Sequence, residues 1–462
     1  MTSTRSKLAI SACIFSAAFI GPRSTLAQEP TLVAQESTVV AQEPTPDERP
    51  TAYVGLELGQ SDNLNRDAAE TRSDITRIAA GFDTRHEGNR LRGSLVGDLQ
   101  FAKYGADLPD DDELLGSVDG QVALHAVPNR FWWDVRYGSG QVRTDPRAPI
   151  SPENRERTSV TSLGPSIALP LGDRNTFEAS AYVSTRRFDG TSELNSDLTT
   201  ARVGVSRLID PVTRVAVRFE QSRNEFDVQP ESYRFKTAML EYRRELASGE
   251  AAVSAGRGRV EIGGDADATW VMRLNWSRAL GSRSRLTLWG GRELTDAGQL
   301  FATGGFSGSA PDVSGLPSLP QGVDGRLQGV ILSRSPLRRR SAGASFEMGS
   351  ERGRFNVSLS AFEDEFENEP SLDNDSTSVT AGGSRRLNPM WQIEGYVTVL
   401  AQEYGEIAAE SEDQFLRLTV SRRLARSSSL GFSLERNRRV DAADAFDENA
   451  AFVTLRRDFG RE

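Results

Sequence analysis

Ionised side chains recur at every second position in many short segments of this chain. In one segment, Asp134 and Arg136 alternate with Trp133, Val135 and Tyr137. Guanidinium and carboxylate groups repeated along one face can replace the water around a polar solute, as charged rings do in pores. The alternative is that opposite charges on neighbouring strands pair only with each other and stiffen the wall. We predict the lumen-lining role for Arg92, Asp134, Arg136, Arg202, Arg218, Glu220, Arg243, Arg273, Glu394 and Arg417.

Covalent catalysis and metal chemistry have little support in the sequence. The two histidines, His86 and His125, fall beside short turn-like segments and away from the longer polar ones. No G-x-S-x-G sequence follows a strand and opens a helix, and the carboxylates of Glu363 and Glu365 lie in an acidic segment where such pairs are not specific. The single cysteine, Cys13, precedes the predicted cleavage site, so the mature chain has no thiol for disulfides or metal binding. We predict no enzyme, no metal site and no cofactor.

The elements that must carry the alternating charges are β-strands, because a side-chain period of two separates an apolar face from a polar one. Such segments follow one another from about Thr51 to Phe459. A hydrophobic content of 37% is low for a large soluble core but sufficient for an apolar band on one face of a closed sheet. We predict an all-β fold, a transmembrane antiparallel β-barrel of about 20 strands (18–22). A soluble propeller is the alternative, although it would not need apolar side chains on its outside.

The apolar residues of each segment fall on the face predicted to contact lipid. Trp133, Trp270 and Trp391 lie near strand ends, where indole rings favour the membrane interface. The predicted lipid-facing residues include Leu91, Leu95, Leu99, Phe101, Val118, Val122, Leu124, Leu163, Ile167, Leu169, Leu171, Trp270, Met272, Leu274, Trp276, Trp391, Ile393, Val397 and Val399.

The connections between segments form two classes. Every second connection is short and rich in Gly, Pro, Asn and Asp, as at residues 87–89, 128–129 and 388–389. The intervening connections are mostly longer and acidic, such as residues 108–113 and 406–413. Short turns on one side and long loops on the other are typical of outer-membrane barrels. With an even number of strands, both termini are then predicted to be periplasmic.

The longest connection spans residues 298–334. It contains Pro311, Pro317 and Pro320 and more large apolar side chains than a freely solvated loop needs. A barrel of about twenty strands has a wide bore, since barrels of roughly 16–18 strands hold water channels and those of about 22 are plugged. We expect this loop to fold inward and narrow the bore, and a lid or an outer binding loop is the alternative.

Residues 1–27 have the pattern of a secretory signal. Arg5 and Lys7 precede an apolar run, and small residues end at Ala27. Lipidation at Cys13 is the weaker alternative, because the apolar run before it is short. Residues 28–50 contain an imperfect Ala-Gln-Glu repeat with prolines, which predicts a disordered periplasmic linker. Residues 51–462 are predicted to form the barrel.

The charges are unevenly distributed in this acidic chain, whose formal net charge is −10. Nearly all of its basic residues are arginine, which reflects either a GC-rich genome or recognition of carboxylates and phosphates. Arginine pairs such as 243–244 and 422–423 lie near the short turns, whereas acids gather in the long loops. We expect a basic periplasmic rim and an acidic outer rim, where divalent cations can bridge to lipopolysaccharide phosphates.

The first strand and the loop after it, from Tyr53 to Arg66, include the sequence Ser-Asp-Asn at 61–63. This stretch resembles the opening of uncharacterised outer-membrane barrels associated with exopolysaccharide production. The resemblance implies a barrel in the outer membrane and export of a surface polysaccharide, and it supplies no site residues. The alternating Val453, Leu455 and Phe459 are similar to an outer-membrane assembly signal, although such signals usually end on the aromatic residue.

These patterns predict a porin-like channel in the outer membrane of a Gram-negative bacterium that passes a polar, anionic saccharide or exopolysaccharide. A structural or assembly protein with a closed, salt-bridged lumen is the main alternative, and an outer-membrane enzyme is a weaker one. The expected partners are outer-membrane lipid and lipopolysaccharide, the barrel-assembly machinery, and polysaccharide or periplasmic export components. No nucleic-acid partner is expected. The sequence leaves the solute and the oligomeric state open.

Overall fold

The structure is a computed structural model that describes residues 50–460, apart from 68–69, 106–111, 146–147, 149–150, 152–153, 229–231, 297–332, 406–408 and 442–443. Its contacts divide the chain into Met1–Asp47 and Glu48–Glu462. The predicted signal and the predicted linker up to residue 49 lie outside the described residues, so both stay predictions. The same is true of the predicted inward-folding loop, of which only Ser333 and Arg334 are described.

The described part of the chain consists almost entirely of β-strands, joined by turns and loops. Two short 3-10 turns, η2 (Ser192–Leu194) and η3 (Pro370–Leu372), lie in loops. The strands are β1 (Thr51–Ser61), β2 (Ser73–Glu87), β3 (Leu91–Tyr104), β4 (Asp112–Val127), β5 (Phe131–Arg143), β6 (Arg155–Pro170), β7 (Asn175–Phe188), β8 (Ser196–Asp210), β9 (Thr213–Phe226), β10 (Ser232–Leu246), β11 (Gly249–Ile262), β12 (Asp265–Ala279), β13 (Ser284–Thr295), β14 (Leu337–Ser350), β15 (Gly353–Phe366), β16 (Asn374–Arg386), β17 (Trp391–Tyr404), β18 (Ala409–Ala425), β19 (Ser428–Asp441) and β20 (Phe446–Phe459).

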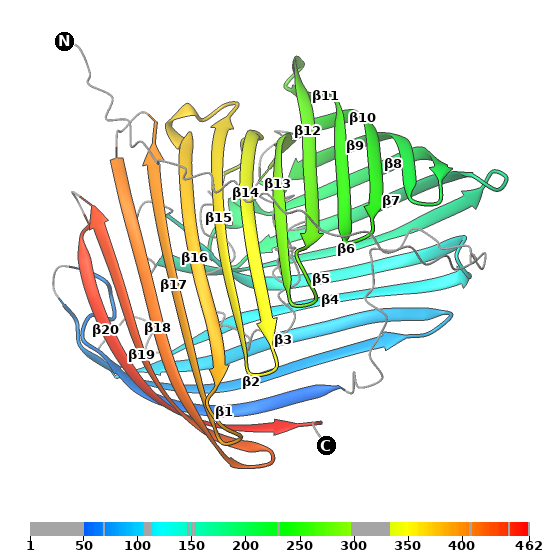
Figure 1. Cartoon of the computed structure of the whole chain (residues 1–462). Helices are drawn as coiled ribbons and strands as arrows, with labels where there is room; N and C mark the ends of the chain where they lie inside the picture. The colour runs from blue at the N-terminus through cyan, green and yellow to red at the C-terminus, as the bar shows by residue number, and fades with distance from the viewer. Residues whose placement is uncertain are drawn as a thin grey trace, which may run out of the picture. The chain divides into compact units, whose positions relative to one another are not determined.

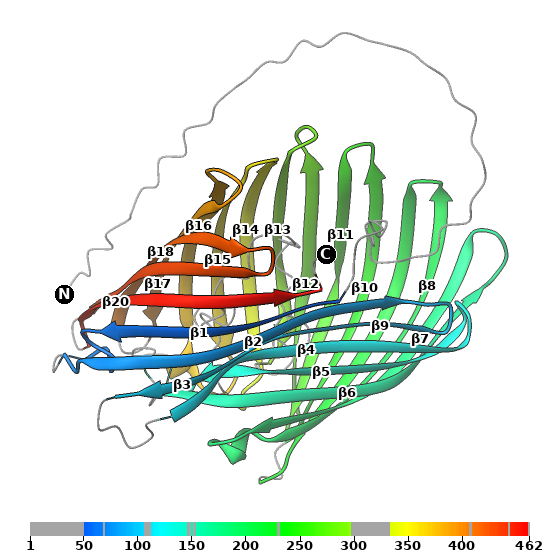
Figure 2. The ribbon, with the colours of Figure 1, turned by 90° about the horizontal axis from the view of Figure 1, so that it is seen from below.

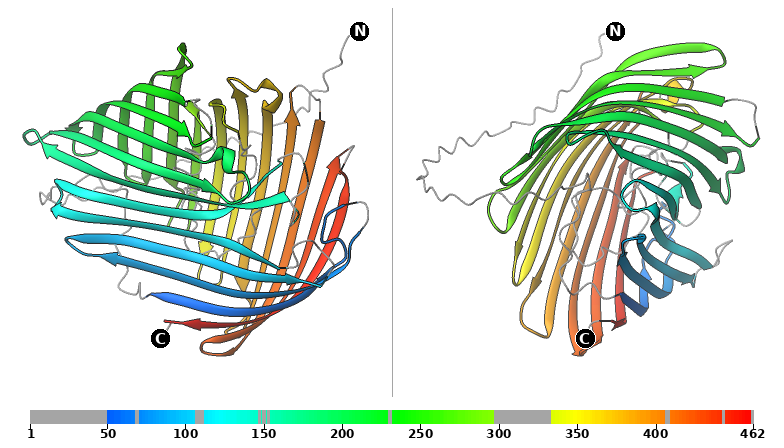
Figure 3. Two further views of the ribbon diagram at one scale, coloured as in Figure 1. Left: turned by 180° about the vertical axis from the view of Figure 1, so that it is seen from behind. Right: turned by 90° about the vertical axis from the view of Figure 1, so that its right-hand side faces the viewer.

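The strands form one closed sheet. Each strand pairs antiparallel with the next one along the chain, and β1 pairs with β20 from Ala52↔Phe459 to Ser61↔Ala450. Figure 1 shows the first strand (blue) beside the last (red), and Figures 2 and 3 show the same order from other sides. Closure satisfies the backbone groups that an open edge would leave unpaired. The prediction of an antiparallel barrel of about twenty strands is confirmed.

The two ends of the barrel differ in their connections. Short turns join β2 to β3 and each later even-numbered strand to its successor, and β1 begins and β20 ends at this same end, which we call the turn end. The opposite end, the loop end, carries the longer connections. The β11–β12 connection is an exception at the loop end, because it contains only Gly263 and Gly264. Both glycines have positive φ values of 58° and 102°, which a tight two-residue hairpin requires.

The outer face of the barrel is apolar, as the alternation predicts. On β1, Leu56 and Leu58 are exposed on the outside while Glu57 between them points inward. Large apolar side chains exposed in this way are stable only against another apolar surface, and a band around a closed barrel fits the hydrocarbon of a membrane. The predicted lipid-facing residues that the structure exposes include Leu91, Leu95, Phe101, Val122, Leu124, Leu163, Leu169, Leu171, Trp270, Met272, Leu274, Trp391 and Val397.

The inner face is less uniformly polar than the sequence pattern predicts. Near the loop end, inward positions carry large apolar side chains that pack into small cores, such as Tyr233 and Phe235 of β10 with Val260 of β11. A second core contains Leu337 and Phe366, and others lie along the same end. The alternation of the sequence assigned the apolar residues to the outer face. It did not predict these inward cores, because an apolar side chain can avoid water by packing against other side chains inside the barrel as well as by contacting lipid.

Candidate functional site in the barrel interior

The predicted lumen residues all lie on strand faces opposite the outward apolar residues. Most of them alternate with exposed apolar neighbours, as Arg218 does between Val217 and Phe219. Their exposure divides them into two groups, and all of the exposed residues are arginines. Arg92 and Arg417, with the carboxylates of Asp134, Glu220 and Glu394, are partly buried. The exposed set, which we call the arginine ladder, is Arg136, Arg202, Arg218, Arg243 and Arg273.

Four members of the arginine ladder pair with carboxylates on nearby strands. The guanidinium of Arg202 on β8 donates to Glu220 on β9 at 2.8 Å. Arg218 on β9 lies between two acids, at 3.4 Å from Glu178 on β7 and 3.2 Å from Glu241 on β10. These contacts run around the wall rather than along one strand, so the closed sheet brings the partners together.

The ladder continues over the next strands with the same chemistry. Arg243 on β10 pairs with Glu250 on β11 at 2.8 Å, and Arg273 on β12 pairs with Glu293 on β13 at 3.0 Å. The paired arginine side chains are 45–60% exposed, whereas their carboxylate partners are 24–30% exposed. The carboxylates therefore lie closer to the wall, and the guanidinium groups are the charges that a solute in the lumen meets first.

The wall formed by β1, β2 and β17–β20 has a different character. Arg417 on β18 lies 2.9 Å from Glu435 on β19 and 3.8 Å from Glu57 on β1, and Arg77 on β2 donates to Glu57 at 2.7 Å. The Arg77 guanidinium also lies 4.6 Å from the centre of the Phe452 ring. Most of these side chains are largely buried, so their charges pair with each other within the wall rather than face a solute.

Glu57 and Arg77 were not among the predicted lumen residues. The alternation of Leu56, Glu57 and Leu58 contains the signal that could have identified the glutamate. No sequence signal links it to Arg417, because β1 and β18 become close only when the sheet closes through β20 and β19.

Two other predicted residues take part in local polar contacts. Asp134 accepts hydrogen bonds from Trp132 at 2.9 Å, Ser166 at 2.8 Å and Tyr182 at 2.9 Å. Glu394 accepts one from the neighbouring Gln392 at 2.5 Å. Because Asp134 accepts three hydrogen bonds from these neighbours, its carboxylate is held in the wall between β5 and β7.

Side chains narrow the interior toward the loop end. Buried Arg186 on β7 lies 3.3 Å from Asp296, which follows β13, although five strands separate these elements in the sheet. Arg143 on β5 reaches to 4.0 Å from Asp413 on β18, and buried Arg439 on β19 lies 3.2 Å from the same carboxylate. Contacts between strands that are distant in the sheet show that the interior is narrow at this end. The side chains of the arginine ladder, by contrast, are exposed.

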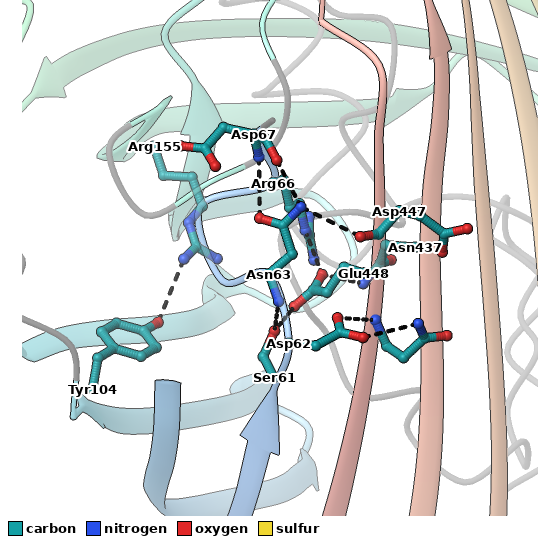
Figure 4. A network of polar contacts seen from close by, with 11 residues as sticks. Ser61, Asp62, Asn63, Arg66, Asp67, Tyr104, Arg155, Asn437, Asp447 and Glu448 are labelled. Carbon is teal, nitrogen blue, oxygen red and sulfur yellow. Dashed lines mark hydrogen bonds and ion pairs between the residues drawn. The ribbon is translucent and has the colours of Figure 1, made fainter. Parts of the chain in front are cut away.

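The loop after β1 is fastened across the junction of the first and last strands (Figure 4). Glu448 on β20 accepts hydrogen bonds from Ser61 at 2.6 Å, Arg66 at 2.8 Å and Asn437 at 2.7 Å. The amide of fully buried Asn63 donates to the backbone oxygen of Asp67 at 2.8 Å. The Ser-Asp-Asn sequence at 61–63 therefore fastens the first loop to the last strand, where the sheet closes.

The described residues contain no cluster of three or more His, Cys, Asp or Glu side chains arranged to hold a metal ion. His125 is buried near the turn end and stacks on Trp132, with ring centres 5.6 Å apart. Within the described ranges, no helix has the length and apolar content needed to cross a membrane.

A closed antiparallel sheet, an apolar exterior and a charged interior define the class of the protein. It is an outer-membrane-type β-barrel. No protein-family model matches its sequence, and no curated protein sequence matches it.

Several solved structures are similar to this chain at low sequence identity. The ferric enterobactin receptor of Pseudomonas aeruginosa is 11% identical with a TM-score of 0.43, over 89% of this chain and 80% of the receptor. The FrpB iron transporter of Neisseria meningitidis is 10% identical with a TM-score of 0.44, over 89% of this chain and 81% of the transporter. OccK2 of Pseudomonas aeruginosa is 10% identical with a TM-score of 0.36, over 89% of this chain and 98% of OccK2. Similarities of this size identify neither a solute nor a function.

Proposed function

We propose that the protein is a channel in the outer membrane of a Gram-negative bacterium and that it passes a polar, anionic solute of the saccharide or exopolysaccharide class. The turn end faces the periplasm and the loop end faces outward. The orientation follows the general rule that outer-membrane barrels have short periplasmic turns and longer outer loops.

The observation that carries the proposal is the exposure of the arginine ladder. Its paired guanidinium groups are about twice as exposed as the carboxylates behind them, although the charges nearly balance in number. Planar guanidinium groups bind carboxylates and phosphates through two parallel hydrogen bonds. Such donors can replace the hydrogen bonds to water that a polar solute loses when it enters the lumen. An anionic sugar polymer has both the charge and the hydroxyl groups for this wall.

Electrical recording tests the channel directly. The purified barrel is inserted into a planar lipid bilayer, and current is recorded at fixed voltage. An open lumen gives discrete conductance steps, whereas complete absence of steps after verified insertion contradicts the proposal. Addition of an acidic oligosaccharide should then interrupt the current more often than a neutral oligosaccharide of equal length.

A closed, structural barrel is the second candidate. The contacts Arg186–Asp296 and Arg143–Asp413 favour it, because they join distant strands across the loop end. In that case the ion pairs rigidify the barrel and no solute passes.

The resemblance of the first strand and loop supports export of a surface polysaccharide, for which periplasmic export components are proposed partners. The barrel-assembly machinery is a proposed partner for insertion of the barrel into the membrane.

A further inference from the structure

The outer surface of β9–β12 changes from apolar to cationic over a few residues along each strand. The strand register arranges the outward residues in rows that run across the four strands. One of these rows is apolar and consists of Val217, Leu240, Ala255 and Met272. The next row toward the loop end consists of Phe219, Ala238, Arg257 and Trp270. Two further rows follow, namely Gln221, Lys236, Arg259 and Ala268, and then Arg223, Arg234, Glu261 and Ala266.

The three rows nearer the loop end contain five positively charged side chains, which we call the basic patch. They are Arg223, Arg234, Lys236, Arg257 and Arg259. Glu261 is surrounded by three of these cations, with Lys236 at 2.8 Å, Arg259 at 3.3 Å and Arg234 at 3.7 Å. Arg223 pairs with Glu225 at 2.6 Å. Five cations thus share two carboxylates. Beyond the patch, on the β7–β8 side, Arg187 pairs with Asp197 and Asp227.

The position of the patch relative to the apolar band indicates what it contacts. Trp270 is 65% exposed and Phe219 is 54% exposed, and both lie in the row where the apolar band ends. Exposed indole rings favour the boundary between hydrocarbon and headgroups. The next row of side chains lies about 7 Å further along the strands, since two residues advance a strand by that distance. The patch therefore lies at the level of lipid headgroups.

Other parts of the outer surface at this end carry the opposite charge. Arg340 on β14 is paired with Glu363 and Glu365 on β15, and further acids lie on the outward face of β16–β18. Those further acids are Asp375, Glu403, Glu410 and Glu412. The basic patch is thus a local feature of β9–β11 and not a general property of the rim.

We propose that the basic patch binds the phosphate groups of a phosphorylated glycolipid, the lipid A part of lipopolysaccharide, in the outer leaflet. Arginine forks and a lysine contact the phosphates, and the acyl chains lie along the apolar row that contains Leu240 and Met272. This contact needs no bridging metal ion, unlike the contact expected at an acidic rim. The inference rests on the proposed orientation of the barrel and not on conduction through it.

The test compares binding of lipid A with two phosphates to the purified detergent-solubilised barrel and to two triple variants. The patch variant is Lys236→Gln, Arg257→Gln and Arg259→Gln. The matched control, Arg340→Gln, Arg436→Gln and Arg438→Gln, removes the same charge from outward positions elsewhere. The patch variant should bind at least about tenfold more weakly, since each exposed charge contact contributes a modest share. The control should bind as the native protein does, and Glu261→Gln should bind more tightly because it releases three cations.

Lipid A without phosphates provides the second comparison. It should bind weakly and equally to the native protein and the patch variant. Equal binding of the two lipids to the native protein, or equal losses in both triple variants, would overturn the inference. Displacement of lipid A by millimolar inorganic phosphate would also overturn it and would indicate a site for free anions. Conductance of the same preparations separates the two proposals, because loss of current with normal lipid binding counts against the channel alone.

Discussion

Asp62 and Asn449 are joined by two side-chain-mediated hydrogen bonds although 387 residues separate them in the chain. The backbone N–H of Asn449 donates to Oδ1 of Asp62 at 2.6 Å, and Nδ2 of Asn449 donates to Oδ2 at 3.0 Å. The backbone N–H of Asp62 returns a bond to the carbonyl of Asn449 at 3.1 Å. This pair extends the β1–β20 ladder by one step into the loops, so the point where the sheet closes is reinforced by side chains.

Closure can be tested at Glu448, the carboxylate that joins the first loop to β19 and β20. We expect Glu448→Gln to lower the free energy of unfolding by roughly 2–4 kcal/mol, because it removes a buried negative charge that accepts hydrogen bonds from Ser61, Arg66 and Asn437. The adjacent Asp447→Asn is the matched control, since Asp447 pairs with Arg436 in an exposed position. The measurement is urea unfolding in detergent, followed by the heat-induced gel shift of folded barrels. Equal stability of the two variants would contradict the role of Glu448 in closure.

Ion selectivity should depend on the arginine ladder. Arg218→Ser combined with Arg273→Ser removes two exposed positive charges from the lumen and leaves their carboxylate partners in place. The reversal potential under a salt gradient should therefore shift toward cations. The control is Arg223→Ser with Arg436→Ser, which removes equally exposed arginines from the outer face. A shift of the same size in both double variants would show that the ladder does not set selectivity.

The contacts across the loop end should limit the current. Arg143→Ala removes a contact between β5 and β18 while the pair between Arg439 and Asp413 remains. We expect a larger single-channel conductance, measured in the same bilayer system. Arg436→Ala is the control, since Arg436 on β19 is exposed on the outer face and pairs with Asp447. If conductance stays at the native value, the narrowest point lies elsewhere, and deletion of residues 298–334 then tests the predicted inward loop.

A buried ion pair between β14 and β15 offers a separate measure of how dry the interior is. Arg339 donates to both oxygens of Asp364, at 2.7 and 2.6 Å, and its guanidinium lies 5.0 Å from the centre of the Phe362 ring. We expect Asp364→Asn to destabilise the barrel by about 3–5 kcal/mol, because it leaves a buried guanidinium without a counter-charge.

The neighbouring acid on the outer face provides the control for this substitution. Glu363→Gln removes a carboxylate whose partner Arg340 is exposed, so it should change stability by less than about 1 kcal/mol. Both variants are measured by unfolding in detergent. A small effect of Asp364→Asn would mean that water reaches the pair.

The sequence was sufficient to predict the strands, their number to within 18–22, and the direction of the apolar band. The period of two is a local property, so Leu56, Glu57 and Leu58 already indicate which side contacts lipid and which does not. The alternating lengths of the connections likewise indicate antiparallel hairpins, with short turns at one end of the barrel and longer loops at the other. The predicted lumen residues follow from the same periodicity, and their contact with a solute stays a prediction.

Only the closed barrel decided which charges are exposed in the lumen and which are locked in the wall. Arg218 and Arg417 have the same type of sequence environment, yet one is exposed beside the lumen and the other lies between Glu57 and Glu435. The inward apolar cores around Tyr233 and the contact between Arg186 and Asp296 were equally invisible to the sequence. The physical reason is that closure brings strands distant in the chain to within contact distance, and burial depends on those neighbours rather than on local alternation.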